Sequence, residues 1–314
     1  MTILLATDFS KPALKAYRYA AALALGLKAR LLVLNVLPTA MPLDPEYPVH
    51  ALYLKQVHEE SKAELEQFTR RAQQDGLRFE THQVPGDPSE CIIDMADAEK
   101  AVLIVMGTHG RTGLDRVLLG SVAEKVVRQA RSPVMTVRGT EADSQPVSGG
   151  LLPMGCFLVP IDFSDCAQEA FEFAVSLAKP VGAVMRLIHA FDQPAYPLDF
   201  SLFKVTDEKA LHARVRERLQ KLVTVLKDQG VSAEVVCQVG LPADVILAQA
   251  TMIPGSMIVM GTHGRRGWQH MAMGSIAEHV VRHAACPVLT VKSPKYTAAL
   301  AAKSPPEVSH AKES

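Results

Sequence analysis

The chain has 314 residues, of which 48% are hydrophobic and 21% are charged. This length exceeds that of an ordinary domain with a single hydrophobic core, so it predicts about two domains. Lysine plus arginine and aspartate plus glutamate number 33 each. The balance argues against a general nucleic-acid-binding protein or a protein of acidic membrane surfaces, because such partners attract a basic surplus.

Strand-like and helix-like segments alternate along the first half. Apolar strands are expected at residues 3–7, 29–37, 78–84, 101–106 and 133–137. Helices are expected between them: one that Ser10 caps and that runs through Pro12 to Gly26, one over about residues 50–74, one after Pro88 and one after Ser121. The second half repeats the strands at residues 155–161, 183–191, 232–239, 256–260 and 287–291.

The two halves of the chain repeat each other. Asp8 and Gly107 have counterparts at Asp162 and Gly261, each 154 residues later. Between Val105 and Val137, 20 of the 33 positions are identical to their counterparts. A repeat of this length predicts two copies of one domain and not the short units of a solenoid.

Polar, glycine and proline residues mark the expected domain boundaries. We expect a first domain over residues 1–138, a linker over 139–153, a second domain over 154–292 and a flexible tail over 293–314.

Apolar strands separated by helices predict a parallel sheet covered on both faces. Five strands with right-handed crossovers predict an α/β fold of two tandem doubly wound domains, each with strand order 3-2-1-4-5. In such sheets a ligand binds beyond the strand C-termini at the topological switch, here between the first and fourth strands. Asp8 ends the first strand and Met106 and Gly107 end the fourth, so we expect a ligand there.

A glycine-rich segment follows the fourth strand of each copy: GTHGRTGLDRVLLGS at residues 107–121 and GTHGRRGWQHMAMGS at residues 261–275. Glycine reaches positive φ and lets backbone N–H groups approach a bulky anion. Ser121 and Ser275 are each followed three residues later by glutamate, which is capping-box spacing and predicts a helix N-terminus that favours phosphate. Neither segment is a GxxxxGK[ST] loop, and neither first strand leads into GxGxxG.

The pattern Gly107-x2-Gly110-x9-Gly120-Ser121, with Asp8, resembles the nucleotide-binding motif of universal stress proteins. It recurs as Gly261-x2-Gly264-x9-Gly274-Ser275 with Asp162. The resemblance covers both copies, and the chain is similar to tandem members in which two such domains are fused. It implies an adenine-nucleotide site that takes ATP, with Mg²⁺, and a stress-response or regulatory role in which occupancy stabilises one conformation or partner surface.

The resemblance also implies a role for each residue of the motif. Asp8 and Asp162 would meet the adenosine, and Val36 and Ala190 would contact adenine through the backbone. Ribose and phosphates would be lined by Met106, Gly107, His109 and Gly110, and in the second copy by Met260, Gly261, His263 and Gly264. The phosphate end would be held by Gly120, Ser121 and Val122, and by Gly274, Ser275 and Ile276. Because Val36 is replaced by Ala190, the two adenine pockets are expected to differ.

Several of these residues also have purely structural explanations. Asp8 would serve as a helix cap, His109 and His263 as exposed loop residues, and Met106 and Met260 as core residues at strand ends. Cys166 is expected to pack in a helix and not to act as a nucleophile. The five cysteines are scattered and lack CxxC spacing, as in reduced cytosolic proteins.

Three function classes remain open. The first is a nucleotide-binding regulatory protein, the second a slow ATPase or self-phosphorylating enzyme, and the third a nucleotide-free scaffold. The loops offer no lysine of the kind that fast phosphoryl transfer requires, so we expect slow hydrolysis at most. No apolar run approaches the roughly 20 residues of a membrane span, and the start MTILLATDFS is not that of a signal peptide, so we expect a cytoplasmic protein.

The last strand of each copy, PVMTV and PVLTV, is the expected pairing edge. In single-domain relatives this strand commonly joins two chains about a twofold axis. Here the two copies would pair within one chain as a pseudo-dimer, while a further homodimer stays open.

Overall fold

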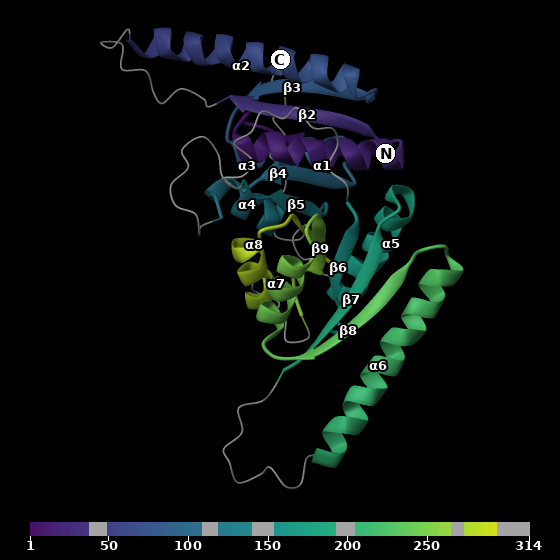
Figure 1. Ribbon diagram of the computed structural model, residues 1–314. Helices are drawn as coiled ribbons and strands as arrows, with labels where there is room; N and C mark the ends of the chain where they lie inside the picture. Colours follow the sequence, from purple (N-terminus) through teal and green to yellow (C-terminus); the bar gives the residue numbers. More distant parts are fainter. Residues whose placement is uncertain (38–48, 109–118, 140–153, 193–204, 265–272, 294–314) are drawn as a thin grey trace, which may run out of the picture.

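The computed structural model describes residues 1–37, 49–108, 119–139, 154–192, 205–264 and 273–293 (Figure 1). In the first half the strands are β1 (Thr2–Ala6), β2 (Arg30–Leu37), β3 (Phe79–Pro85), β4 (Leu103–Gly107) and β5 (Val134–Val137). The helices between them are α1 (Lys11–Leu27), α2 (Val49–Gln74), α3 (Pro88–Ala98) and α4 (Ser121–Gln129). Each predicted element of this half is present, with ends that differ from the prediction by a few residues.

The second half repeats this order. Its strands are β6 (Cys156–Pro160), β7 (Val184–Phe191), β8 (Ala233–Val239), β9 (Ser256–Gly261) and β10 (Val288–Val291). Its helices are α5 (Asp165–Val181), α6 (Val205–Asp228), α7 (Pro242–Met252) and α8 (Ser275–His283). The predicted linker and tail lie almost entirely outside the described residues.

All ten strands form one sheet in the order β3-β2-β1-β4-β5-β10-β9-β6-β7-β8. Within each half the strands are parallel, and each half has the predicted order 3-2-1-4-5. The second half shows the same parallel pairing. The prediction of a doubly wound α/β fold is therefore confirmed.

The two halves meet where β5 and β10 pair in antiparallel orientation. Met135 lies opposite Leu289, and each of these residues is the counterpart of the other in the repeat. On either side, the Thr136 hydroxyl donates to the Val288 carbonyl at 3.3 Å and the Thr290 hydroxyl donates to the Val134 carbonyl at 3.2 Å. This junction therefore has local twofold symmetry, and the expected pairing of the last strands within one chain is confirmed.

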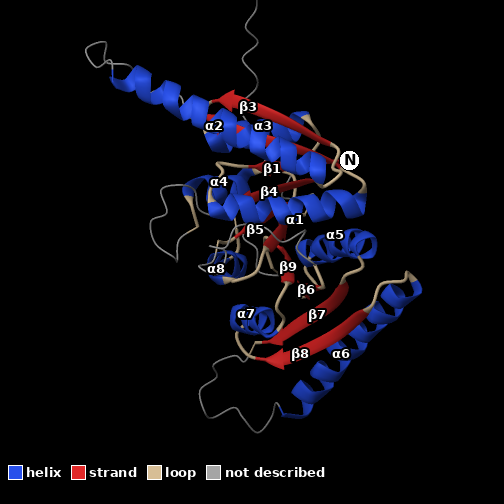
Figure 2. Ribbon diagram, turned by 45° about the horizontal axis from the view of Figure 1, so that its top comes forward, coloured by secondary structure: helices blue, strands red, loops and turns tan. Residues whose placement is uncertain are grey.

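Helices cover both faces of the sheet, and each face carries one hydrophobic core that runs through both halves (Figure 2). Buried residues of α1, α2, α5 and α6 join the first core, and those of α3, α4, α7 and α8 join the second. Successive residues of β1 alternate between the cores, with Ile3 and Leu5 in one and Leu4 and Ala6 in the other. Because side chains alternate along a strand, a strand covered on both faces must be apolar at every position.

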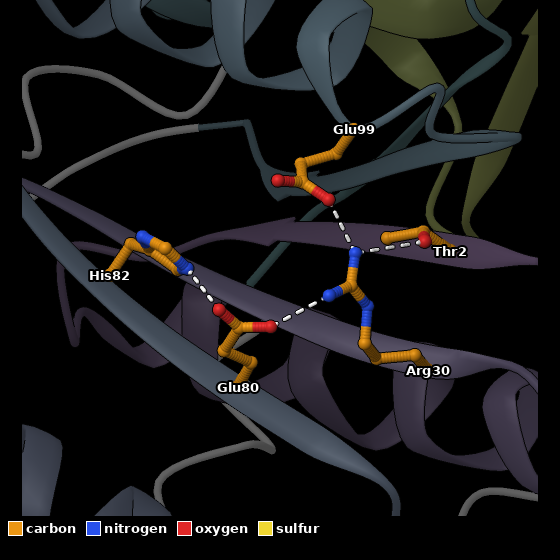
Figure 3. Close-up of polar contacts among 5 residues, drawn as sticks. All are labelled: Thr2, Arg30, Glu80, His82 and Glu99. Carbon is orange, nitrogen blue, oxygen red and sulfur yellow. Dashed lines mark hydrogen bonds and ion pairs between the residues drawn. The ribbon is translucent and has the colours of Figure 1, made fainter.

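A polar cluster connects the strands of the first half near their N-terminal ends (Figure 3). Arg30 at the start of β2 donates to Glu80 of β3 at 2.7 Å and to the Thr2 hydroxyl of β1 at 3.3 Å, and it also pairs with Glu99 just after α3. His82 contacts the other oxygen of Glu80 at 2.7 Å, and this hydrogen bond is the main reason that the pKa of Glu80 is lowered. The cluster lies at the opposite edge of the sheet from the predicted ligand site.

Candidate nucleotide site

The topological switch of each half brings two strand ends side by side. In the first half Ala6 of β1 lies opposite Met106 of β4, so Asp8 and Gly107 emerge from neighbouring strands at the same edge. In the second half β6 and β9 are neighbours in the same way, with Asp162 two residues after β6 and Gly261 the last residue of β9. These four predicted residues therefore lie at the strand C-termini, where doubly wound sheets bind ligands.

The aspartate after the first strand of each half forms a turn and does not cap the next helix. Oδ1 of Asp8 accepts hydrogen bonds from the backbone N–H of Ser10 at 3.0 Å and from its hydroxyl at 2.6 Å. Asp162 makes the same two contacts with Ser164, at 3.0 Å and 2.6 Å. Ser10 and Ser164 themselves cap α1 and α5. The prediction for Ser10 is thus confirmed, and capping does not explain the aspartates.

The residue between each aspartate and its serine has an unusual backbone. Phe9 has φ 62° and Phe163 has φ 64°. A bulky residue in the left-handed region is uncommon and costs free energy. Both halves have this conformation at the same position. The fold therefore holds this turn, and the aspartate in it, in place despite the cost in free energy.

The glycines after β9 allow three segments to meet closely. A Cβ on Gly261 would lie 2.7 Å from the backbone carbon of Cys166 in α5, and a Cβ on Gly264 would lie 2.8 Å from Oδ2 of Asp162. Ser164 also donates from its hydroxyl to the His263 carbonyl at 3.4 Å. The loop after β9 is thereby held against the turn after β6, and only glycine fits at these two positions without displacing a neighbour.

His263 is buried, and its Nδ1 lies 3.0 Å from the Thr262 hydroxyl. The alternative that His263 is an exposed loop residue is therefore wrong, because the loop folds the imidazole inward. Its counterpart His109, together with Gly110, lies outside the described residues. Cys166 is also buried, and burial raises the pKa of its thiol, as expected of a packing residue and not of a nucleophile.

The helix after each glycine segment begins one residue earlier than the capping-box spacing suggests. Gly120 is the N-cap of α4 and Gly274 is the N-cap of α8, and neither helix has a side-chain cap. Ser121 and Ser275 are the first helical residues, so the prediction that they cap these helices is wrong. The reason is tertiary: Gly120 donates its N–H to the Thr108 carbonyl at 2.8 Å, and Gly274 donates to Thr262 at 2.8 Å.

A glycine N-cap changes what the helix end offers. The first N–H groups of any helix have no partner within the helix, and Ser10, Asp87 and Ser164 supply an acceptor for α1, α3 and α5. At α4 and α8 no side-chain oxygen of the described residues takes that place. Backbone amides and the positive end of the helix dipole there suit an anion such as phosphate.

The remaining predicted residues surround this edge. Met106 and Met260 are buried in the second core, as core residues at strand ends. Val36 near the end of β2 and Ala190 near the end of β7 are half-buried and pack on the same core. Val122 and Ile276 are the second residues of α4 and α8, and Ser121 and Ser275 are exposed.

Two buried polar residues at this edge were not predicted. Asn35 of β2 donates to the Thr7 carbonyl at 2.8 Å, and its Oδ1 accepts from Ser61 at 2.7 Å and from Gln83 at 3.1 Å. The matching residue of the second half is His189, whose Nδ1 lies 2.6 Å from the Ile161 carbonyl. Both side chains hold the end of the first strand of their half. A polar residue at the same position of the repeat in two largely apolar strands is the signal that could have found them.

The second half replaces the polar network by aromatic packing. His189 packs against Phe163 at 5.6 Å and Phe191 at 4.9 Å between ring centroids. His212 of α6 stacks on Phe191 at 3.6 Å, and the Arg218 guanidinium lies 4.1 Å from the centre of the Phe163 ring. The side chains around Asn35 and around His189 therefore differ between the two halves.

Two doubly wound domains joined through their last strands define a tandem α/β protein. Residues 1–138 and 156–292 each match the sequence profile of the Universal stress protein family. The chain belongs to the universal stress protein family.

Known proteins of this family cover the whole tandem arrangement. A universal stress protein of Mycolicibacterium smegmatis is 27% identical over 296 residues, which are 92% of this chain and 96% of that protein. One from Methanocaldococcus jannaschii is 34% identical over 140 residues, which are 43% of this chain and 81% of that protein. The crystal structure of a universal stress protein from Archaeoglobus fulgidus superimposes with a TM-score of 0.66 at 25% identity, covering 93% of this chain and 98% of that chain. None of the described helices is both long enough and apolar enough to cross a membrane.

Proposed function

We propose that the chain is an ATP-binding regulatory protein of the stress response, with one adenine-nucleotide site in each half. The observation that carries the proposal is the glycine N-cap of α4 and of α8, each placed at a topological switch and each lacking a side-chain cap. Phosphate oxygens would accept hydrogen bonds from the amides that α1, α3 and α5 give to serine or aspartate. Membership of the universal stress protein family supports the same assignment.

In each proposed site, different described residues would contact different parts of the nucleotide. Gly120, Ser121 and Val122, or Gly274, Ser275 and Ile276, would hold the phosphate end through backbone N–H groups. Gly107 or Gly261 would let the ribose and phosphates approach the backbone, beside His263 and Gly264 in the second site. Asp8 or Asp162 would meet the adenosine, with Val36 or Ala190 at the adenine and Met106 or Met260 beneath the ribose. Mg²⁺ would accompany the phosphates as a ligand of ATP.

We propose that the bound nucleotide acts as a regulatory ligand and not as a substrate that the protein turns over. A ligand that contacts the loop after β9 and the turn after β6 at once would stabilise the conformation in which these segments meet. Slow ATP hydrolysis or self-phosphorylation is the second candidate, and a nucleotide-free scaffold the third. Because the cysteines are scattered in the sequence, as in reduced cytosolic proteins, we also propose that the protein is cytoplasmic.

The proposal is tested by changing the charge at a helix N-cap. Gly274 has φ −73° and ψ 151°, which any residue adopts, and aspartate and asparagine are both good N-caps. Gly274→Asp would put a carboxylate where phosphate binds, while Gly274→Asn is a neutral control of the same shape. Titration calorimetry with ATP and Mg²⁺ is expected to show second-site affinity at least about tenfold weaker in the aspartate variant than in the asparagine variant, since one close charge repulsion is worth about 1.4 kcal/mol or more. Equal affinities in both variants and the parent chain would exclude phosphate from this helix end.

A further inference from the structure

Two histidines lie on one exposed face of α8, away from the switch edge. His279 and His283 are four residues apart, so their side chains project from the same side of the helix. Both are exposed, and their imidazole rings are stacked with centroids 4.1 Å apart and planes inclined by 25°. Two histidines at this helical spacing are the arrangement with which HExxH helices bind zinc.

The hydrogen bond of His283 prepares its ring for a metal. Nδ1 of His283 lies 2.8 Å from the backbone carbonyl of His279. A carbonyl oxygen only accepts, so Nδ1 carries the proton and Nε2 is left with a lone pair. Histidines that bind metals almost always donate their other ring N–H to a carbonyl or carboxylate in this way. The tautomer that this contact requires is the one a metal requires.

We propose that the Nε2 atoms of His279 and His283 together bind one divalent transition-metal ion, zinc or copper, on the surface of α8. To bind one ion, the two rings would turn out of their stacked arrangement until both Nε2 lone pairs converge on it at the 2.0–2.1 Å typical of a zinc–imidazole bond. Imidazole nitrogen favours zinc and copper, whereas magnesium and calcium prefer oxygen. Among the described residues no group of three or more histidines, cysteines, aspartates or glutamates gathers around one point. Water would therefore complete the coordination.

The site belongs to the second half alone and does not depend on nucleotide binding. At the matching positions of α4 the first half has Lys125 and Gln129, which cannot form such a pair. Bound metal would link two turns of α8, whose first residue, Ser275, lies in the proposed phosphate site. The chain thus contains its own control: a homologous helix with the same fold and no histidine pair.

The test is zinc binding by the full, untagged chain after removal of metal and nucleotide. Zn²⁺ binding is measured by calorimetry for the parent, His279→Lys, His283→Gln and the double variant. Each substitution introduces the residue that α4 has at the matching position. Each single variant is expected to lose affinity by at least about tenfold, because removing even an outer-shell partner costs 10–100-fold. The double variant should lose little more, since one histidine alone does not chelate. His82→Gln, far from α8 in the sequence and held by Glu80, is the control that should bind as the parent does.

Copper gives an independent view of the ligands. With one equivalent of Cu²⁺, the parent should show an electron paramagnetic resonance spectrum of a site with two nitrogen ligands, and either single variant should lose it. Identical zinc isotherms for the parent and both single variants would overturn the proposal, whatever the outcome of the nucleotide experiments. Because both positions are exposed, the circular dichroism spectrum of each variant is expected to match that of the parent.

Discussion

Lys292 donates a hydrogen bond of 2.9 Å from its Nζ atom to the backbone carbonyl of Arg128. The two residues belong to different halves: Lys292 follows β10, and Arg128 is in the last turn of α4. The same ammonium group also donates to the Ala130 carbonyl at 2.5 Å. A cation at the C-terminal end of a helix satisfies carbonyls that the helix leaves unpaired and complements its dipole. The second half therefore holds the end of the helix whose beginning is the proposed phosphate site of the first half.

The burial of Lys292 predicts a dependence of stability on pH. Burial lowers its pKa to about 8, from an ordinary value of 10.5. Between these values the unfolded chain holds a proton that the folded chain has lost, so the Lys292 contribution to the free energy of unfolding rises with pH and levels off above 10.5. The rise is about 3 kcal/mol. Urea unfolding of the parent and of Lys292→Met at several pH values should show it as a difference between the two curves.

A constant difference between those curves from pH 7 to pH 10.5 would contradict the prediction. The comparison with Lys292→Met is needed because burial also raises the pKa of the Cys156, Cys166 and Cys286 thiols. Those thiols favour the unfolded state at high pH, an effect of the opposite sign that is common to both proteins and cancels in the difference.

Gly264→Ala is predicted to weaken nucleotide binding in the second half while leaving the fold intact. A Cβ at this position would lie 2.8 Å from Oδ2 of Asp162. Because Oδ1 of Asp162 is held by Ser164, the carboxylate must leave its place or the loop must move. We expect second-site ATP affinity to fall by about tenfold, or about 1.4 kcal/mol. Gly155→Ala, where a Cβ meets nothing within 4 Å, should bind as the parent does in calorimetry.

The junction of β5 and β10 is predicted to stabilise the whole chain. Leu289 and Met135 face each other there and are both fully buried. Leu289→Ala should lower the free energy of unfolding by about 2–5 kcal/mol, because a large buried side chain is removed and a cavity remains. Leu211→Ala makes the same chemical change at an exposed position of α6 and should change it by less than about 0.5 kcal/mol. Similar values for the two variants in urea unfolding would show that the junction is not tightly packed.

Asn35 is predicted to stabilise the switch edge of the first half. Asn35→Ala removes the acceptor of Ser61 and Gln83 and the donor to Thr7, in a buried place that leaves them without that partner. The expected loss is about 1–3 kcal/mol in urea unfolding. Gln56→Ala removes an exposed hydrogen bond to Glu60 and should cost less than about 0.5 kcal/mol. If the two variants unfold alike, the network of Asn35 contributes nothing.

Most of the fold follows from patterns in the sequence. The pairing of β5 with β10 was expected from the resemblance to universal stress proteins. The constant spacing of the repeat and the alternation of apolar strands with helices predicted the order of both half-sheets, and the cap at Ser10 predicted the start of α1. These features are local or periodic, and the packing agrees with them. The position of the aspartates and glycines at the switch followed from the strand order, because parallel strands bring their C-terminal ends to one edge.

Features that depend on contacts between segments were not predictable in this way. The spacing from Ser121 to Glu124 fits a capping box, yet Gly120 is the cap because its N–H reaches Thr108 across the loop. Glu124 instead pairs with Arg128 at 2.9 Å along α4. The burial of His263 likewise depends on how the loop folds back, which no local pattern encodes.

The central claim, that each half binds an adenine nucleotide, is tested most directly by what the protein carries when purified. Freshly purified chain is denatured by heat, and released nucleotides are identified and counted per chain by chromatography and mass spectrometry. A second preparation is first saturated with ATP and Mg²⁺ and then freed of excess ligand. In that preparation the released adenine nucleotide is expected to approach two molecules per chain. No adenine nucleotide in either preparation, and no heat of ATP binding in calorimetry, would contradict it.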